Sequence, residues 1–396
     1  MTVARASPLL ERLGARHPII LAPMFGGSGP DLQAAVANAG GFAFFPCGSL
    51  PSASVRAGLK AAREKLVQTA APVGANIWAS AMIQENTSWS IGQAEASAEA
   101  ARRQAAAFEE VQGRGATLTP TASQSCADAE ALVEEQVSAL IEEGVNVVSV
   151  HFGWLSSEQV KRFLAAGVYL IGNATNVAEA RFLEHAGACA IIAQGAGAGG
   201  HRGTFLDKEN FRDGAMIGTE QLVRDVVSAV SLPVIAAGGI MSGADVQTMF
   251  TAGAQAAMLG TAFLTAHESI IHVEHRRALL LPSQSGHSTA VRTVLTQAFT
   301  GKPARAIANR WTDEMDELQR KLPNCFNGLA NGRPLAGAAG KANRTDLMMM
   351  WAGENFAHCR ELPAAEIVAA IAGQEERPRN VAVDDRIDVF EVRSAM

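Results

Sequence analysis

Short, continuous apolar runs alternate with longer amphipathic stretches along most of the chain. Eight apolar runs stand out: 18–22 (PIILA), 42–45 (FAFF), 73–77 (VGANI), 145–150 (VNVVSV), 168–171 (VYLI), 188–193 (ACAIIA), 233–237 (PVIAA) and 256–259 (AAML). Such runs are typical of parallel strands that are covered on both faces. The segments between them, such as AEALVEEQVSALIEEG and NVAEARFLEHAG, predict helices, and several end in glycine, a common C-terminal stop. Eight strand–helix repeats predict a closed (β/α)8 TIM barrel rather than a doubly wound sheet.

The same pattern predicts the domain organisation. The barrel is expected over residues 15–270. Residues 80–125 are too long for an ordinary loop, so we expect a helical insertion after the third strand. Residues 271–372 are expected to form a small cap on the substrate side of the barrel mouth, with a last helix near 363–373. The charged segment 373–396 is expected to be peripheral.

Composition excludes several classes of protein. Of the 396 residues, 48% are apolar and 18% are charged, which predicts a large core and little disorder. A net charge of −6 argues against nucleic acid or an anionic membrane as the main partner. No run of 18 uncharged apolar residues appears, and the first residues lack the apolar stretch of a signal peptide. We therefore expect a cytoplasmic protein.

Cysteine and histidine spacing predicts no metal site. The five cysteines, at 47, 126, 189, 325 and 359, form no C-x-x-C pair and are expected to be reduced thiols. A group of three histidines, His267, His272 and His275, could suggest a metal site. Because the surrounding stretch HESIIHVEHRR is polar and no cysteine lies near it, we expect a solvated helix face instead.

The stretch AQGAGAGGHRG (193–203) matches G-x-G-x-x-G at Gly195, Gly197 and Gly200. A Rossmann fingerprint needs a strand before it and a helix opening directly after it. A strand is expected before this stretch, but the residues after it have no helical apolar period. The glycines are therefore expected to form a loop at the end of the sixth strand.

Glycines also follow the last two expected strands, as Gly238-Gly239 and as Gly260 before Thr261. In TIM barrels the loops after the seventh and eighth strands often build a phosphate site. Glycine lets backbone N–H groups approach phosphate oxygens, and the Thr261 hydroxyl can add a hydrogen bond. Tight turns alone could explain either motif. The two motifs together favour a cofactor that carries phosphate.

Several stretches in this order resemble the nitronate monooxygenase family, once called 2-nitropropane dioxygenases. They are PIILAPMFGG (18–27), AVANAGGF (35–42), GANI (74–77), VVSVHFG (147–153), IGNATNVAEA (171–180), AQGAGAGGHRG, PVIAAGGI (233–240) and MLGTAF (258–263). Weaker matches are GKPARAIANRW (301–311) and WAGENF (351–356). Members of this family are FMN-dependent TIM-barrel enzymes.

The resemblance implies roles for individual residues. His151 matches the histidine that family members use as catalytic base. Met24 could be a core residue, although its backbone N–H is well placed for flavin N5. FMN contacts are expected from Pro23, Met24, Asn76, Gln194, Gly199, Gly200, Gly239, Gly260 and Thr261. The implied reaction is the oxidation of an alkyl nitronate, or a nitroalkane, by O2 to a carbonyl compound and nitrite. The family also makes a homo-oligomer possible.

Three features depart from the family. Gly197 stands where the family usually has glutamate, which predicts one negative charge fewer beside Gln194. Tyr169 is the one tyrosine of the chain, so the pocket tyrosines of the bacterial enzymes cannot be present. The 80–125 insertion and the charged C-terminal tail are also unusual. These departures bear on which substrate is bound more than on whether a flavin is bound.

The chemistry of the candidate residues fits the same picture. Imidazole at His151 suits removal of a proton next to a nitro group near neutral pH, although a packed core histidine is an alternative. Asn76 and Gln194 need hydrogen-bond partners if they are buried, and the flavin ring edge offers them. His201 and Arg202 could bind an anion or could stabilise their own loop.

Two other functions remain open at this stage. One is an FMN enzyme of the same superfamily that takes hydride from NAD(P)H, of the enoyl-acyl carrier protein reductase or quinone reductase type. The other is a flavin-binding accessory protein without turnover of its own.

Overall fold

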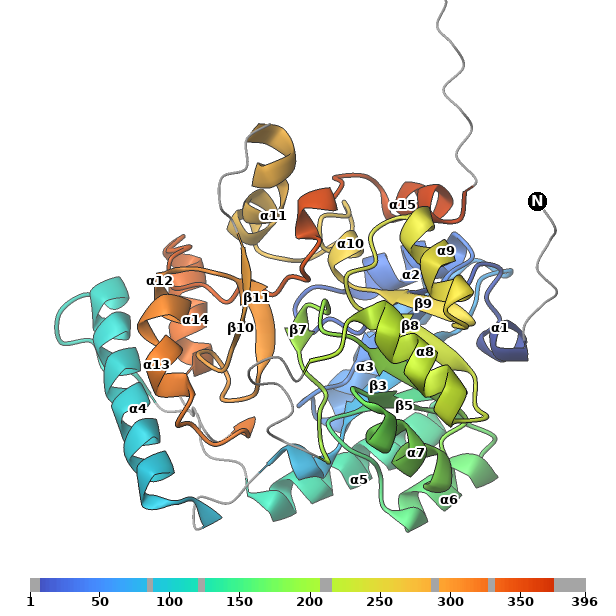
Figure 1. The fold of residues 1–396 in the computed structure, drawn as a ribbon, viewed down its shortest axis with the longest axis horizontal. Helices are drawn as coiled ribbons and strands as arrows, with labels where there is room; N and C mark the ends of the chain where they lie inside the picture. The colour runs from blue at the N-terminus through green and yellow to red at the C-terminus, as the bar shows by residue number, and fades with distance from the viewer. Residues whose placement is uncertain are drawn as a thin grey trace, which may run out of the picture.

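The computed structural model describes residues 8–83, 88–119, 125–206, 216–285, 292–326 and 332–373 (Figure 1). Most of the charged tail predicted to be peripheral, 374–396, lies outside these residues. None of the helices in the described ranges is long and apolar enough to cross a membrane.

The centre of the molecule is a closed parallel barrel, which confirms the predicted (β/α)8 architecture. Its strand order is β1-β2-β3-β4-β5-β6-β8-β9, and β1 pairs with both β2 and β9. The eight strands are β1 (Ile19–Leu21), β2 (Phe42–Pro46), β3 (Val73–Trp78), β4 (Val147–His151), β5 (Tyr169–Ala174), β6 (Ala190–Gln194), β8 (Val234–Ala237) and β9 (Ala256–Leu259).

Several strands reach further toward the mouth than the apolar runs that predicted them. β5 continues past Ile171 through Gly172 and Asn173, β4 ends on His151, and β6 ends on Gln194. Hydrogen bonding to neighbouring strands extends the ladder across these small or polar residues, which an apolar pattern does not include. As a result, polar side chains stand at the carboxyl ends of the strands, where barrel enzymes place their sites.

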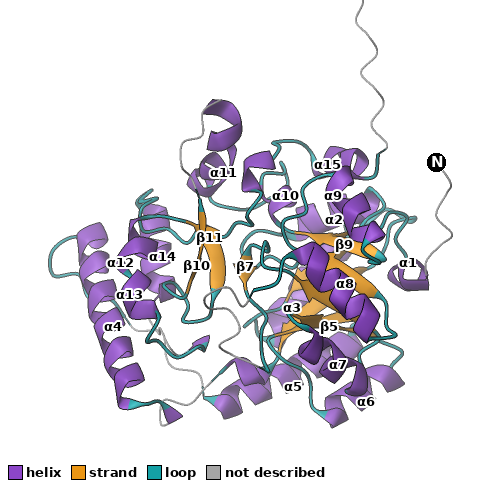
Figure 2. Ribbon diagram, in the orientation of Figure 1, coloured by secondary structure: helices purple, strands orange, loops and turns teal. Residues whose placement is uncertain are grey.

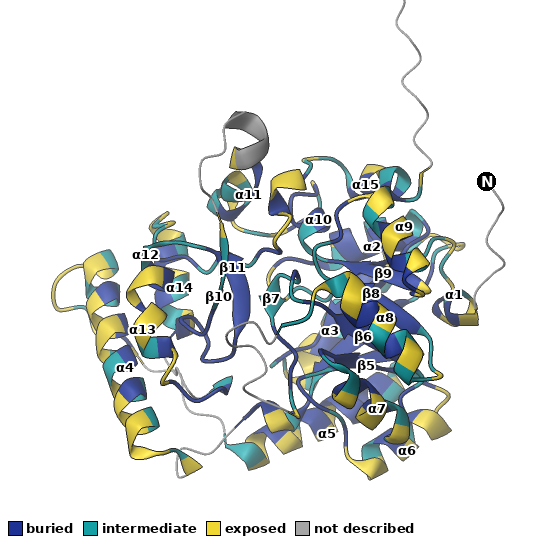
Figure 3. Ribbon diagram, viewed as in Figure 1, coloured by how far each residue is buried: buried dark blue, intermediate teal, exposed yellow. Residues whose placement is uncertain are grey.

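Helices surround the barrel, as Figure 2 shows. They are α2 (Pro30–Asn38), α3 (Ser52–Arg63), α5 (Cys126–Glu142), α6 (Ser157–Ala165), α7 (Val177–His185), α8 (Thr219–Ala229) and α9 (Gly243–Thr251). Their inner faces are buried against the strands and their outer faces are exposed (Figure 3). Several begin with a capping box, for example at Ser156 with Gln159 and at Ser242 with Asp245.

A helix from much later in the chain than the last barrel strand completes the ring of helices. β9 is followed by α10 (Thr261–Leu264), which has only four residues. α15 (Ala364–Ile371) contacts both α9 and α2, between the last and the first helices of the ring. The predicted last helix therefore packs on the barrel. At the other end of the barrel, α1 (Pro8–Leu13) buries Leu9 and Leu13 against the inner strand residues.

A second layer lies beside the barrel mouth. It holds α11 (Val273–Ser285), α12 (Arg310–Glu314), α13 (Asp316–Gln319), α14 (Gly332–Lys341) and a three-stranded antiparallel sheet. The sheet joins β10 (Thr293–Thr296), β11 (Ala304–Ile307) and β7 (Gly200–His201) in the order β10-β11-β7. Its third strand comes from the glycine loop after β6, so this sheet connects the cap to the barrel mouth. The apolar pattern of the sequence does not predict this sheet.

The insertion after β3 contains a helix, α4 (Ile91–Gln112), of 22 residues. α4 contacts α13 and α14, on the side of the cap that faces away from the barrel (Figure 1). An ion-pair network joins Glu110 of α4 to Arg310 and Arg344 of the cap. The insertion therefore belongs to the cap in space, although it interrupts the barrel in sequence.

Candidate active site

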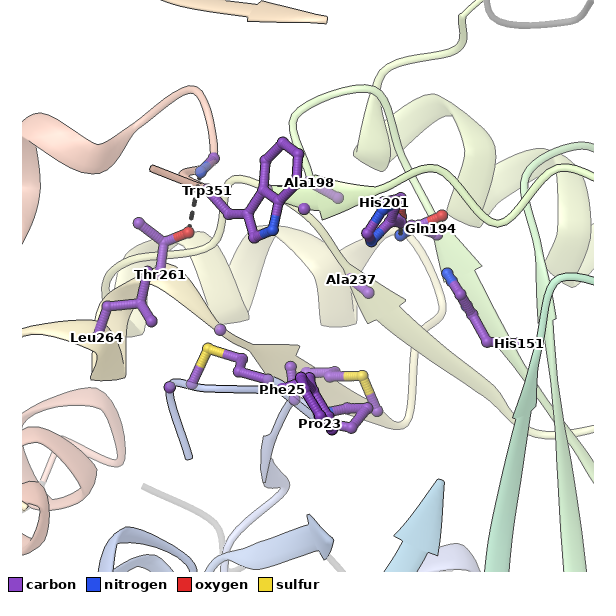
Figure 4. A pocket seen from close by; sticks show the side chains of 18 of the residues that line it. Pro23, Phe25, His151, Gln194, Ala198, His201, Ala237, Thr261, Leu264 and Trp351 are labelled. Atoms are coloured by element: carbon purple, nitrogen blue, oxygen red, sulfur yellow. Dashed lines mark hydrogen bonds between the residues drawn. The ribbon is translucent and has the colours of Figure 1, made fainter. Parts of the chain in front are cut away.

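A cavity of about 400 Å³ opens at the carboxyl ends of the barrel strands. Its wall includes all ten predicted site residues: Pro23, Met24, Asn76, His151, Gln194, Gly199, Gly200, Gly239, Gly260 and Thr261. These residues come from six different strand ends. In Figure 4, Thr261 and His151 lie at opposite ends of the cavity. The roles given to these residues stay predictions, but the fold brings all of them to one place.

Glycine loops form the Thr261 end of the cavity. Gly238 and Gly239 have φ values of 121° and 70°, which glycine adopts without strain. Gly260 has φ −110°, and a Cβ atom there would lie 3.3 Å from the Met24 sulfur atom. The Thr261 hydroxyl accepts a hydrogen bond from the Gly353 N–H at 2.9 Å. This end has the exposed backbone and the hydroxyl that a phosphate group needs.

Buried amides line the inner part of the cavity. Asn76 donates from Nδ2 to Ser149 Oγ at 2.9 Å. Gln194 donates from Nε2 to the His201 carbonyl at 2.9 Å and accepts from the Gly203 N–H at 2.8 Å. The flavin was expected to supply these partners. Much of the hydrogen bonding of both amides is instead satisfied by the protein, which fixes their orientation.

The backbone N–H of Met24 already has a hydrogen-bond partner in the protein. Its N–H donates to Ser28 Oγ at 3.2 Å, so this group is engaged within its own turn. The resemblance had suggested that it faces flavin N5. The turn after β1 is tight because the Gly27 and Ser28 N–H groups both bond the Met24 carbonyl. This local hydrogen bonding could not be seen in the residue pattern.

Two histidines stand at the inner end of the cavity, and both are held neutral. The pKa of His151 is lowered to about 4, mainly by burial. A hydrogen bond with the His201 backbone opposes this shift, and the nearby charges of Lys302 and Arg202 add to it. Burial also lowers the pKa of His201 to about 3, with smaller effects from His151, Lys302 and Arg333. At neutral pH both rings can therefore accept a proton.

Aromatic rings enclose His201. Trp78 and Phe326 stack with centroids 5.2 Å apart, and Phe152 meets both edge-on. His201 Nε2 lies 2.9 Å from Thr300 Oγ1. Because its ring lies between barrel residues and the cap residues Phe326 and Trp351, it belongs to the contact between the two layers. Phe152 takes φ 67°, an uncommon value for a bulky side chain.

Arg202 stabilises its own loop. Its guanidinium is buried, with 4% exposure, and donates to the carbonyls of Gln194 and Thr175. The buried Glu179 carboxylate accepts hydrogen bonds from Thr175, Thr204, Phe205 and Leu206. The loop-stabilising alternative therefore holds for Arg202. The sequence pattern does not single out Glu179, because an acidic residue is ordinary in the first turn of a helix, here the one that begins at Val177.

The predicted solvated face of three histidines is wrong for one of them. His267 and His272 are exposed, but His275 is buried and its Nε2 lies 3.1 Å from the Trp351 carbonyl. His272 and His275 line the cavity, which the cap completes. Among the described residues, no group of three or more His, Cys, Asp or Glu is placed to hold a metal ion.

A carboxylate from another part of the chain lies close to Gly197. Glu354 Oε2 lies 3.2 Å from the point that a Cβ atom on Gly197 would occupy. The expectation of one negative charge fewer beside Gln194 than in the family stays a prediction. Within the described residues, no helix begins directly at the glycines of AQGAGAGGHRG: the last glycine of the match, Gly200, starts the short strand β7. Tyr169 lies at the far end of the barrel, where its hydroxyl donates a hydrogen bond to the Cys189 carbonyl.

The comparisons with known proteins agree with this geometry. The sequence profile of the family described as nitronate monooxygenase matches residues 7–374. A nitronate monooxygenase from Paraburkholderia phytofirmans is 38% identical over 375 residues, which cover 92% of this chain and 93% of that protein. The chain belongs to the nitronate monooxygenase family. It is thus an enzyme, a flavin-dependent oxidoreductase, as the resemblance implied.

Two solved structures place this family member among its neighbours. A nitroalkane oxidase from Streptomyces ansochromogenes superposes with a TM-score of 0.79 at 36% identity, covering 93% of this chain and 97% of that one. FabK from Thermotoga maritima gives a TM-score of 0.65 at 24% identity, covering 92% of this chain and 94% of that one. The second likeness shows the shared barrel fold.

Proposed function

We propose that this member of the nitronate monooxygenase family binds FMN and oxidises alkyl nitronates with O2 to carbonyl compounds and nitrite. The observation that carries the proposal is the convergence of ten predicted residues on one cavity, with glycine loops at one end and a neutral histidine at the other. A single elongated site can then hold a phosphate and a reacting centre together.

The cavity fits FMN by its glycine turns and by a buried hydrogen-bond donor. The Gly238-Gly239 and Gly260 turns leave room for phosphate oxygens, and a Cβ atom at any of these positions would reduce that room. Asn173 lines the same cavity and is 3% exposed, and its Nδ2 has no hydrogen-bond partner in the described part of the chain. A buried donor of this kind is costly unless a ligand accepts from it. When bound, the flavin ring supplies the redox chemistry.

The chain's own residues supply binding and proton transfer. Phe25, Leu264, Ile271, Met348 and Met349 line the cavity and offer an apolar surface to an alkyl group. His151, neutral near pH 7, can take the α-proton of a nitroalkane and so convert it to the nitronate. The positive charges of Lys302 and Arg202 that lower its pKa also favour an anion beside it.

The experiment that tests this function measures flavin reduction without oxygen. The purified yellow protein is mixed anaerobically with a propyl nitronate, with NADPH or with NADH, and the flavin absorbance is followed. We expect rapid bleaching by the nitronate alone, with nitrite formed after air is admitted. Bleaching by a pyridine nucleotide alone would favour the reductase alternative. No bleaching by any of the three would contradict turnover of these substrates, as expected of an accessory protein.

A further inference from the structure

Three consecutive residues of the C-terminal segment each bind a different loop at the glycine-rich end of the cavity. The Gly353 N–H donates to Thr261 Oγ1 at 2.9 Å. The Glu354 N–H donates to the Gly197 carbonyl at 3.1 Å. The Asn355 side chain donates to the Gly239 carbonyl at 2.7 Å. Residues 353–355 thus bridge the loops that follow β9, β6 and β8.

The bond to Thr261 orients its hydroxyl. A threonine hydroxyl has one proton to donate and two lone pairs to accept with. Gly353 occupies a lone pair, as the dashed line in Figure 4 shows, so the proton stays available for another acceptor. A phosphate oxygen at this end of the cavity is such an acceptor. The segment therefore prepares Thr261 to act as a donor.

The segment is also fixed to the cap. Trp351 forms an isolated β-bridge with Ala306 next to Arg305 on β11. The Arg305 side chain is 6% exposed, donates twice to the Ala196 carbonyl and pairs with Glu354 at 2.9 Å. Arg305 therefore binds the glycine loop and the segment at the same time.

The fit between the segment and the loop is tight. A Cβ atom on Gly199 would lie 2.5 Å from the Gly353 nitrogen, and one on Gly353 would lie 2.8 Å from the Gly197 carbonyl oxygen. Such distances are below van der Waals contact, so the two backbones touch without side chains between them. A side chain at Gly199 or at Gly353 would therefore force the segment away from the loop.

We propose that residues 353–355 form a clasp, so that phosphate binding to the three loops and docking of the C-terminal segment stabilise each other. This inference rests on the proposed FMN site. The coupling is reciprocal by thermodynamic linkage: the factor by which docking of the segment strengthens phosphate binding equals the factor by which bound phosphate strengthens docking. The clasp residues are positioning residues, because they act through the loops.

The test compares FMN with riboflavin, which has the same ring but no phosphate. Apoprotein carrying Asn355→Ala is titrated with each flavin, beside the wild type and the control Asn38→Ala. Asn38 also donates to a backbone carbonyl, at 3.0 Å, but lies outside the cavity. We expect the Kd for FMN to rise about 2- to 10-fold in Asn355→Ala, the range of one net hydrogen bond, with riboflavin unchanged. Asn38→Ala should change neither.

Hydrogen exchange gives the reciprocal measurement. In the wild type, FMN should slow exchange of the Gly353 and Glu354 amides more than riboflavin does. Equal protection by both flavins, or an equal loss of affinity for both in Asn355→Ala, would overturn the clasp. Failure of the wild type to bind FMN would instead overturn the proposed cofactor, so the two results are distinguishable.

Discussion

Glu354 places its Oε2 atom 3.2 Å from the position that a Cβ atom on Gly197 would occupy, while its Oε1 atom pairs with Arg305 at 2.9 Å. The family usually has a glutamate at position 197, and here a carboxylate reaches the same place from the C-terminal segment. A carboxylate at position 197 and the carboxylate of Glu354 would therefore lie beside the same arginine, Arg305.

This relationship predicts the outcome of restoring the family residue. Gly197→Glu should bring two carboxylates together beside Arg305 and displace residues 353–355, because like charges in a partly buried place repel. We expect a lower melting temperature and weaker FMN binding. Adding Glu354→Gln to Gly197→Glu should recover most of the loss. A double variant as impaired as Gly197→Glu would show that the two positions act independently.

The phosphate site can be tested at Gly260. Gly260→Leu places a side chain in the cavity, and since Gly260 has a negative φ the backbone is not strained by the change. The variant should purify folded but colourless. Gly239→Leu should also lose flavin, but its positive φ adds strain, so Gly260 gives the clearer result. Full flavin occupancy of Gly260→Leu, measured by absorbance, would show that the phosphate does not bind at this loop.

His151 can be tested by comparing a neutral and an ionised substrate. A nitronate is already deprotonated, whereas a nitroalkane must lose its α-proton, a step to which a positioned base contributes about 10²–10⁴-fold. His151→Asn should reduce nitroalkane turnover, where the wild type has any, by about that factor and nitronate turnover far less. The exposed His185 provides the matched control His185→Asn. Equal loss on both substrates, together with lost stability, would indicate a packing role.

The pH profile gives an independent measure of the same residue. Because the pKa of His151 is lowered to about 4, kcat/KM for a neutral nitroalkane should stay constant from pH 8 to about 5. Below about pH 4 it should fall about tenfold per pH unit as the ring is protonated. A decline centred near pH 6.5, the ordinary value for histidine, would show that His151 is not the base or is not buried in the working enzyme.

Stability should also depend on pH through His275. Burial lowers its pKa to about 4, so between pH 6.5 and 4 the unfolded chain binds a proton that the folded chain does not. Its contribution to stability is therefore lost as pH falls through that window. Each pH unit between the two pKa values corresponds to about 1.4 kcal/mol. His275→Gln should show a shallower loss of melting temperature from pH 6.5 to 4; an unchanged slope would exclude His275.

The sequence by itself determined the barrel and the ten cavity residues near the ends of its strands. Unalternated apolar runs such as 256–259 form strands wherever both faces are covered, and parallel pairing then brings all strand ends to one mouth. Glycines at 239 and 260 and the histidine at 151 follow these runs directly, so their meeting place could be predicted from local pattern and topology.

Tertiary structure alone decided what surrounds that mouth. β7 consists of Gly200 and His201, and β11 of Ala304–Ile307; such short strands form because they pair with each other, not because of their own pattern. α4 and α15 are amphipathic helices whose partners lie far away in sequence. The same holds for Glu354 beside Gly197, because a contact between residues so distant along the chain depends on how the layers pack and leaves no periodicity to read.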